Sequence, residues 1–364
     1  MKKYLNKSKK KVIFFCPSIE EGGVEKNLIN ICNNISQFQG VTLITANTNK
    51  KKKFNRNIEF ISPKTNKFNN QTRLIKSFVS IFLLIRNYKK NPTTMISFQS
   101  NIFAIIISKI LGYKIIIRSN QSPIFYARNI IKRKIMKFFF KKADKIIVNS
   151  NEFKNVFKKY FNLNSVVIYN LIEEPKTIYK LSKKTLKNNF FEKSKKIINI
   201  LSVGRLVEQK DQITILKALD LIKNKQKYKL IIIGKGVKYK ILKSFIKKKK
   251  LSKYAKILNY QKNVYPYYLK SDVFILSSLY EGLPNTLIEA VTLGVPIISS
   301  NCKTGPKEIL KNGKYGKLFK VKDYKKLSSL IVKTKKKQKI KFINDKRFDF
   351  KLNLKKYESL INSL

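Results

Sequence analysis

The chain has 364 residues and a formal net charge of +60, from 80 Lys and Arg against 20 Asp and Glu, with no His and no Trp. This length is sufficient for two domains of ordinary size, and the charge suggests nucleic acid or an anionic membrane as a partner. However, 72 of the basic residues are Lys spread along the whole chain and only 8 are Arg. A nucleic-acid-binding protein gathers Arg and Lys on one face between aromatic residues, so the composition disfavours specific recognition of nucleic acid.

The cysteines and the hydropathy exclude two further classes of protein. Cys16, Cys32 and Cys302 are an odd number without paired spacing, so they predict neither a disulfide framework nor a zinc site, and they fit a reducing cytoplasm. No apolar run reaches the roughly 18 residues of a membrane-spanning helix. The longest runs, at 78–85 and 102–112, predict buried helices. We expect a cytoplasmic protein whose contact with a membrane is peripheral, on its inner face.

The first half of the chain alternates short apolar runs with longer amphipathic segments. Apolar spacing of three and four residues predicts helices at 24–36 and 129–142. The apolar runs that predict strands are 12–17, 41–46, 94–98, 113–119, 145–150 and 166–170. The first of these runs follows a basic N-terminus, but it is too short for a signal peptide. The repetition of strand and helix is typical of a parallel sheet with helices on both faces, so we expect a first α/β domain over 1–172.

A polar stretch at 173–196 interrupts this pattern and predicts a connector between two domains. The pattern then restarts with apolar runs at 197–206, 229–236, 255–260, 272–278 and 295–299, which predict the strands of a second domain over 197–345. The last forty residues lose the strand pattern and end in a helical tail. The predicted fold class is therefore α/β, with two Rossmann-like domains.

Two features of the first half are open to two interpretations each. Gly22 and Gly23 lie between the first strand and the first helix, where their backbone can face a phosphate or an acceptor, but a tight loop explains the pair equally well. The segment 129–142 alternates basic and large apolar residues, as a helix at a membrane surface does. A core helix with solvated lysines is the alternative.

The sequence VGRLVEQKD, after the first strand of the second domain, places Arg205 and Lys210 ahead of a helix. A cationic pair at this point can neutralise a diphosphate leaving group. Arg is rare in this chain, so Arg205 carries more weight than Lys210, and a surface salt bridge is its alternative role. Gly234 forms another glycine turn directly after the next strand.

The stretch YEGLPNTLIEAVTLGVPII, from Tyr280, keeps two of the chain's few acids, Glu281 and Glu289, on one turn and helix. We expect Asn285 to cap this helix and Gly294 to end it. A helix start binds anions, and a diphosphate suits it. Carboxylates on either side accept hydrogen bonds from sugar hydroxyls, so the pattern predicts a nucleotide sugar, with ordinary surface acids as the alternative.

These segments together resemble a known family. EGGVEKNL, GRLVEQKD, GKG and SSLYEGLPNTLIEAVTLGVPIISSNCKTGPKEIL are similar to motifs of the bacterial family 4 glycosyltransferases, which are retaining enzymes of the GT-B fold. The C-terminal motifs cover about 140 residues, and the N-terminal half resembles the family mainly in layout. The resemblance implies two Rossmann-like domains facing a cleft, with the acceptor bound by the first and the donor by the second. It also implies that a C-terminal helix, at about 346–364, crosses back to the first domain.

The resemblance implies a role for each motif residue. Glu281, Arg205 and Lys210 would be the catalytic residues. Arg205 and Lys210 would contact the donor diphosphate, Glu281 would lie beside the transferred sugar, and Glu289 would hold the ribose hydroxyls. The other implied donor-binding positions are Gly204, Gly234, Gly282, Leu283, Pro284, Asn285 and Thr286. Members of the family need no metal or other cofactor, and none of the seven Asp forms an Asp-x-Asp pair.

The chain departs from the family in one respect. Many relatives carry a histidine at the end of a strand in the first domain, whereas this chain has no histidine and offers IIIRSNQSP in that region. Arg118 and Asn120 are candidates to replace it, with a structural role as the alternative. Transfer in the family is thought to use the leaving phosphate to assist the acceptor hydroxyl, so an imidazole base is not essential.

The sequence thus predicts a retaining, metal-independent hexosyltransferase. It would move a hexose or N-acetylhexosamine from a nucleoside diphosphate sugar, by preference a UDP-sugar, to a lipopolysaccharide, capsule or other cell-surface glycan or to a lipid-linked acceptor. Its expected partners are that donor, that acceptor and an anionic membrane, with no specific nucleic acid. The alternatives are another GT-B nucleotide-sugar enzyme such as an epimerase, which usually depends on histidine, and a basic nucleic-acid-binding protein.

Overall fold

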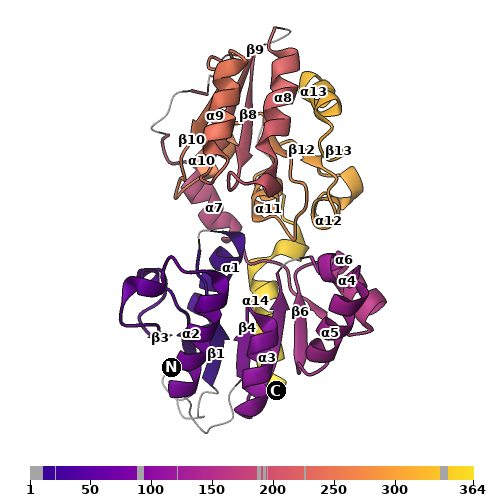
Figure 1. The fold of residues 1–364 in the computed structure, drawn as a ribbon. Coiled ribbons are helices and arrows are strands. Elements are labelled where there is room, and N and C mark those ends of the chain that lie inside the picture. Colours follow the sequence, from indigo (N-terminus) through magenta and orange to yellow (C-terminus); the bar gives the residue numbers. More distant parts are fainter. Residues whose placement is uncertain are drawn as a thin grey trace. The chain divides into compact units, whose positions relative to one another are not determined.

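The computed structural model describes residues 11–20, 22–87, 94–120, 122–186, 190–191, 194, 196–224, 227–336 and 343–364. The chain divides into two compact units (Figure 1). The first comprises Met1–Leu171 and Phe350–Leu364, and the second comprises Ile172–Asp349. Each unit is built on one parallel sheet, as the alternating pattern predicts.

The described residues of the first unit form a seven-stranded sheet in the order β3-β2-β1-β4-β5-β6-β7. Its strands are β1 (Lys11–Phe15), β2 (Gly40–Ile44), β3 (Glu59–Ile61), β4 (Thr94–Ser97), β5 (Lys114–Ser119), β6 (Lys145–Val148) and β7 (Val166–Val167). Its helices are α1 (Gly23–Ile35), α2 (Arg73–Arg86), α3 (Asn101–Ile110), α4 (Ile124–Ala127), α5 (Ile130–Phe140), α6 (Asn151–Val156) and α14 (Phe350–Asn362). The six predicted strands are confirmed, although β7 is shorter than expected, and β3 was missed.

Both faces of the first sheet are buried, as in other parallel sheets. Along β1, Val12 and Phe14 pack toward α1 and α14, whereas Ile13 and Phe15 pack toward α2, α3 and α5. The return of α14 to this unit confirms the expected C-terminal crossing.

The described residues of the second unit form a six-stranded sheet in the order β10-β9-β8-β11-β12-β13. Its strands are β8 (Ile197–Val203), β9 (Lys227–Ile233), β10 (Ala255–Leu258), β11 (Val273–Leu276), β12 (Ile297–Ser300) and β13 (Lys317–Phe319). Its helices are α7 (Pro175–Ser182), α8 (Gln212–Ile222), α9 (Tyr239–Lys248), α10 (Tyr265–Lys270), α11 (Asn285–Thr292), α12 (Pro306–Ile309) and α13 (Tyr324–Val332). The five predicted strands are confirmed, and β13 was missed.

The polar connector predicted at 173–196 is wrong for its first part, which forms α7. Pro175 occupies the first helical position, where its missing N–H costs nothing, and Ile178 is fully buried. The helix packs against α10. The burial of Ile178 and the contact with α10 therefore attach this polar stretch to the second unit. Residues 187–189, 192–193 and 195 of the predicted connector lie outside the described residues.

The expectation that the apolar runs 78–85 and 102–112 form buried helices is only half right. The runs form α2 and α3, but Phe82 of α2 is 62% exposed and Ile110 of α3 is 72% exposed. Within the described ranges, no helix is both long enough and apolar enough to cross a lipid bilayer.

Arg118 has a structural role, so the idea that it contacts a ligand is corrected. Its side chain is fully buried on β5, and its guanidinium donates hydrogen bonds to the Ile168 carbonyl oxygen at 3.2 Å, to Asn120 Oδ1 at 3.0 Å, to Asn170 Oδ1 at 2.8 Å and to the Tyr357 hydroxyl. Asn120 in turn donates to the Phe98 carbonyl oxygen. Arg118 thereby fastens α14 to the sheet and faces no open site.

We expect Tyr357→Phe to lower the free energy of unfolding by about 1.5–3 kcal/mol, since it leaves one N–H of a buried cation without its acceptor. Urea unfolding of the purified chain measures this loss. Tyr260→Phe is the matched control, because Tyr260 is half exposed. Equal stability of the two variants would contradict the role given to Arg118.

Candidate functional site

The order of strands in the second sheet indicates where a ligand binds. From β8 the chain runs to β9 and β10 on one side, and then crosses to β11, β12 and β13 on the other side. The change of direction lies between β8 and β11, which are neighbours. In open α/β sheets, ligands bind outside the carboxyl ends of the strands at such a switch point. The predicted residues follow these two strands, so they meet at this edge.

An ion pair joins the two loops at the switch point. Lys210 Nζ, from the loop after β8, lies 2.5 Å from Glu281 Oε1, from the loop after β11. The Lys210 side chain is 15% exposed and that of Glu281 is 6% exposed. The structure therefore brings together two of the three predicted catalytic residues.

The Glu281 loop is fixed by hydrogen bonds that the sequence did not suggest. Ser278 Oγ donates to Glu281 Oε1 at 2.6 Å, and Thr304 Oγ1 donates to the Glu281 carbonyl oxygen at 2.5 Å.

Burial and the Glu281 carboxylate raise the pKa of the Cys302 thiol to about 12. This thiol stays protonated at neutral pH and cannot act as a nucleophile there.

Arg205, the third predicted catalytic residue, is exposed beside this pair. Its guanidinium donates to Gln209 Oε1 at 3.3 Å, and Gln209 Nε2 donates to the Tyr280 carbonyl oxygen at 2.9 Å. Arg205 forms no salt bridge with an acid among the described residues, so its alternative role as a surface salt bridge is not supported. Gln209 connects Arg205 to the loop that carries Glu281.

The predicted glycines allow the ends of β8 and β9 to approach closely. A Cβ atom on Gly234 would lie 1.9 Å from the carbonyl oxygen of Gly204, which no folded chain tolerates without a shift of backbone. Gly204 N donates to the Ile233 carbonyl oxygen at 3.0 Å. These glycines position the loop that carries Arg205, a backbone role that their place after strands suggests.

The helix α11 begins at the switch point, but Asn285 is its first residue and not its cap. Pro284 occupies the N-cap position, and no side chain caps the helix. The first N–H groups of a helix have no acceptor within it, so they are suited to an anion. Gly282, Leu283 and Thr286 lie in the same turn and first helical turn. Gly294, with a φ of 62°, follows the end of the helix as predicted.

Glu289 is buried one turn into α11, with 3% of its surface exposed. The Tyr268 hydroxyl lies 3.4 Å from Glu289 Oε2 and 3.0 Å from the Thr286 carbonyl oxygen. Burial and the Glu289 carboxylate raise the pKa of Tyr268 well above its usual value, so this hydroxyl remains a donor. The alternative interpretation of Glu289 as an exposed helix residue is therefore wrong.

The first unit has its own switch point, between β1 and β4, and Gly22 and Gly23 lie there. Gly22 is the N-cap residue of α1. Ser18 N donates to Gln99 Oε1 at 3.1 Å, and Gln99 Nε2 donates back to the Ser18 carbonyl oxygen at 2.8 Å. The structure thus places the glycine pair at the edge where a ligand of this unit would bind, with Gln99 as a neighbour that no motif indicated.

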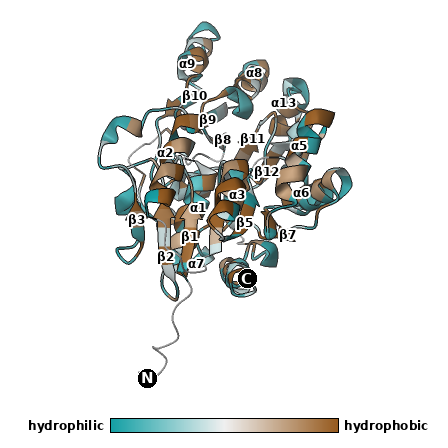
Figure 2. Ribbon diagram, turned by 60° about the horizontal axis from the view of Figure 1, so that its bottom comes forward, coloured by the Kyte–Doolittle hydropathy of each residue, from teal (hydrophilic) through white to brown (hydrophobic). Residues whose placement is uncertain are grey.

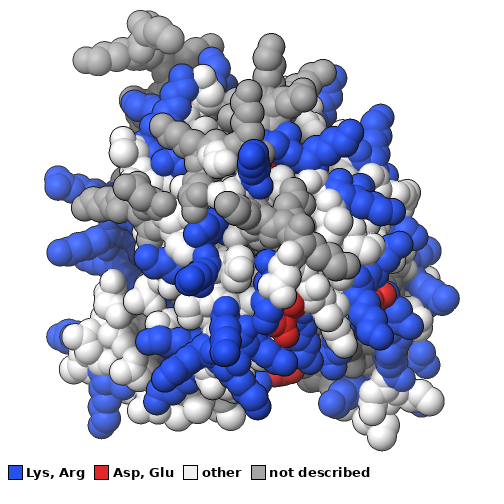
Figure 3. Space-filling view, turned by 90° about the horizontal axis from the view of Figure 1, so that it is seen from above, with Lys and Arg blue, Asp and Glu red and all other residues white. Residues whose placement is uncertain are grey.

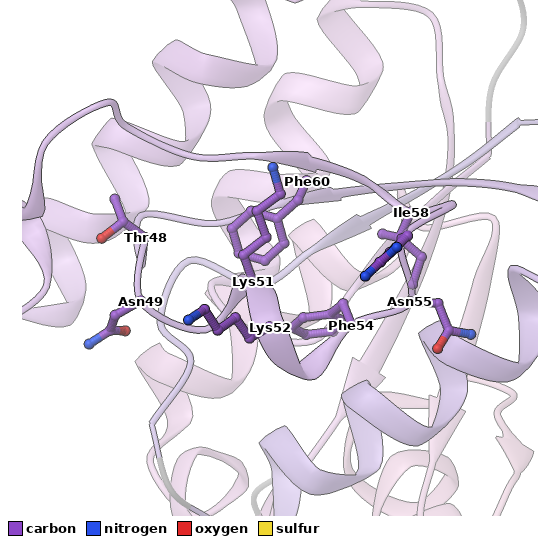
Figure 4. A pocket seen from close by; sticks show the side chains of 9 residues that line it. Thr48, Asn49, Lys51, Lys52, Phe54, Asn55, Ile58 and Phe60 are labelled. Carbon is purple, nitrogen blue, oxygen red and sulfur yellow. The ribbon is translucent and has the colours of Figure 1, made fainter.

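A separate open hollow of about 800 Å³ lies in the first unit (Figure 4). It is lined by Thr48, Asn49, Lys51, Lys52, Phe54, Asn55, Arg56, Ile58 and Phe60. None of these residues was predicted to bind a ligand, and none is buried and charged.

Basic residues are scattered over the face seen in Figure 3 and do not form one continuous stripe. This distribution is in keeping with the even spread of Lys in the sequence.

Among the described residues, no group of three or more His, Cys, Asp or Glu could hold a metal ion.

Residues 182–353 match the family model for glycosyl transferases group 1. This part of the chain is therefore similar to the group 1 glycosyl transferases. The matched range contains the whole Arg205, Lys210, Glu281 and Glu289 constellation.

The sequence of this chain is also similar to those of individual glycosyltransferases. An uncharacterised glycosyltransferase of Methanocaldococcus jannaschii is 34% identical over 254 residues, which are 65% of this chain and 62% of that protein. The chain thus spans less than two thirds of that relative. A Campylobacter jejuni GalNAc-α-(1→4)-GalNAc-α-(1→3)-diNAcBac-PP-undecaprenol α-1,4-N-acetyl-D-galactosaminyltransferase is 27% identical over 319 residues, 85% of this chain and 84% of that protein.

The two units together have the GT-B fold. The crystal structure of Anabaena HepE in complex with UDP matches 97% of this chain and 100% of that chain, with a TM-score of 0.74 and 18% sequence identity. At this identity the likeness shows the fold alone, and it confirms the GT-B fold that the sequence resemblance implies.

Proposed function

We propose that this chain is a retaining glycosyltransferase that moves a hexose or N-acetylhexosamine from a nucleoside diphosphate sugar to a lipid-linked or cell-surface glycan. The observation that carries the proposal is the Lys210–Glu281 ion pair at the switch point of the second sheet, beside exposed Arg205 and the start of α11. Two cations and a helix start are suited to a diphosphate. The group 1 domain match and the UDP bound by the structurally similar HepE support the same donor.

Each residue of the constellation has a part in this proposal. Arg205 and Lys210 neutralise the charge that grows on the diphosphate as the bond from the sugar to its oxygen breaks. Glu281 lies beside the sugar and holds Lys210 in place. Glu289 accepts hydrogen bonds from the ribose hydroxyls.

Transfer with retention needs no imidazole in this arrangement. The acceptor oxygen forms its bond to the anomeric carbon on the face that the diphosphate leaves, and the acceptor proton passes to a diphosphate oxygen. The chain has no histidine at all, which fits a substrate oxygen as the base. No metal or cofactor is required in this proposal, since the protein cations neutralise the leaving group.

We further propose a peripheral location on the inner face of the cytoplasmic membrane, where a lipid-linked acceptor would be found. The name of the Campylobacter jejuni relative includes such an acceptor. On α5, Ile131 is 71% exposed and Phe138 is 59% exposed, with Lys134 and Lys137 exposed beside them. This pattern supports an interfacial helix and disfavours a core helix.

Thermal unfolding in the presence of UDP, GDP, ADP or a short single-stranded RNA tests the donor site. At a hundred times its dissociation constant, one nucleoside diphosphate, by preference UDP, should stabilise the folded state by about 2.7 kcal/mol. The stabilisation should persist at moderate salt and be lost in Glu289→Ala. Stabilisation by RNA alone, vanishing as salt rises, would contradict the proposed function.

A further inference from the structure

The helix α2 carries its apolar side chains outward. Four of them recur at spacings of three and four residues, so they form one stripe along the helix. They are Leu74, Phe78, Phe82 and Ile85, and they are 49% to 62% exposed. The opposite, buried face carries mainly polar side chains, namely Lys76, Ser77 and Ser80, together with Leu84. Ile81 and Leu83 are partly buried against the core of the unit beside Leu84. The helix therefore covers the sheet with part of its apolar surface and leaves a second apolar stripe facing outward.

The orientation of α2 is fixed by hydrogen bonds on its inward side. Lys76 Nζ donates to Ser18 Oγ at 3.3 Å, and the hydroxyls of Ser77 and Ser100 lie 2.6 Å apart. Ser77 Oγ also donates to the Arg73 carbonyl oxygen. Rotation of the helix to bury the apolar stripe would break these bonds and expose Leu84. The outward stripe is therefore a stable feature of the unit.

The apolar surface continues from α2 across α3 to α5. The ring centroids of Phe78 on α2 and Phe103 on α3 lie 5.5 Å apart, and α3 packs against α5. In Figure 2, α2 and α3 are neighbouring helices, and both carry the brown colour of hydrophobic residues. Eleven of the twenty-one exposed large hydrophobic side chains among the described residues lie on these three helices: Leu74, Ile75, Phe78, Phe82, Ile85, Ile106, Ile110, Ile130, Ile131, Ile135 and Phe138. A contiguous exposed apolar surface of this kind usually binds another protein or a membrane.

The charges on the same helices indicate what the contact is. None of the three helices contains an Asp or Glu, whereas all three carry exposed Lys or Arg. Large apolar groups with basic residues between them fit the boundary between lipid headgroups and acyl chains of an anionic bilayer. A second copy of the chain would bring two equally basic surfaces together, which electrostatic repulsion disfavours.

We propose that the outward faces of α2 and α3, continuous with α5, form a docking surface for an anionic lipid bilayer. In this arrangement Phe78 and Phe82 enter the interfacial layer and the basic side chains lie among the headgroups. This inference rests on the peripheral location in the proposed function, which involves α5 alone, and it deepens that proposal by assigning α2 and α3 to the same surface.

A single tryptophan at position 82 tests the proposal, since the chain contains no Trp. Phe82→Trp keeps the surface aromatic, so the variant should fold normally. On vesicles that contain phosphatidylglycerol, we expect its fluorescence to shift to shorter wavelength and to become shielded from acrylamide. Val237→Trp is the matched control, because Val237 is 83% exposed in the second unit, and its fluorescence should not change.

A loss-of-binding variant completes the test. Leu74→Gln combined with Phe82→Gln and Ile85→Gln should weaken vesicle binding about tenfold or more, whereas Leu221→Gln with Val237→Gln and Ile241→Gln should not. The stabilisation by nucleotide should be unchanged in both. The proposal would be overturned if the fluorescence of the Phe82→Trp variant did not respond to vesicles, or if it shifted with protein concentration alone, which would indicate a second copy. The vesicles contain no donor or acceptor, so either failure would count against the membrane surface and leave the proposed glycosyl transfer at the nucleotide site intact.

Discussion

Replacing Glu281 with glutamine is expected to lower the rate of glycosyl transfer by about 10²–10³-fold, equivalent to about 2.7–4 kcal/mol of transition-state stabilisation. The carboxylate holds Lys210 Nζ at 2.5 Å, and in the proposed complex it also lies beside the sugar, where positive charge develops as the diphosphate leaves. A neutral amide keeps the shape and the hydrogen bond from Ser278 but removes the charge. The kcat and KM for the donor, measured with a lipid-linked acceptor, report this loss.

The partner substitution sharpens the test of this ion pair. Lys210→Met should cause a loss of similar size, and the double variant should lose less than the two single losses combined, because both changes remove one unit. Glu208→Gln is the matched control, since Glu208 lies in the same loop but is exposed and pairs with Lys238 at 2.5 Å. Full activity of a folded Glu281→Gln variant would disprove the role of the pair.

The meeting of Lys210 and Glu281 at one edge of the second sheet could be predicted from the sequence, because both residues follow strands. Arg205 and Lys210 come after β8, and Glu281 comes after β11. In a parallel sheet the carboxyl ends of all strands share one edge, so residues placed after strands converge whatever the order of the strands. The rarity of acids in this basic chain also made Glu281 and Glu289 stand out. The partners Ser278, Gln209 and Thr304 are common residue types that belong to no motif, so only the three-dimensional structure shows their contacts.

Other errors arose where a tertiary contact decides the role of a residue. Arg118 belongs to β5, which is buried along almost its whole length. Three of its acceptors, Ile168 and Asn170 after β7 and Tyr357 on α14, are far away in sequence. The apolar run 78–85 correctly predicts a helix, yet the run alone cannot tell which face of that helix meets the sheet. Only the inward bonds of Lys76 and Ser77 show that the apolar stripe faces outward.

Substitution of Gly234 by alanine is expected to destabilise the second unit by about 3 kcal/mol. The new Cβ atom would lie 1.9 Å from the Gly204 carbonyl oxygen, and this neighbour is backbone that cannot swing away. The loops after β8 and β9 would have to separate, which displaces the segment that carries Arg205. Chemical unfolding and the stabilisation by nucleotide should both reveal the change, as a lower free energy of unfolding and a weaker affinity.

Gly204→Ala is the matched control for this prediction, because it adds the same methyl group to the other side of the same contact. Its Cβ atom would meet only Lys210 side-chain carbons at 3.6 Å, an ordinary contact. Neither glycine has a positive φ, so backbone strain does not separate the two variants, and steric contact alone should. We expect Gly204→Ala to change the free energy of unfolding by less than about 1 kcal/mol. If the two alanine variants are equally stable, the close approach of the loops after β8 and β9 does not hold the donor site in place, and the site must owe its geometry to the Lys210–Glu281 pair instead.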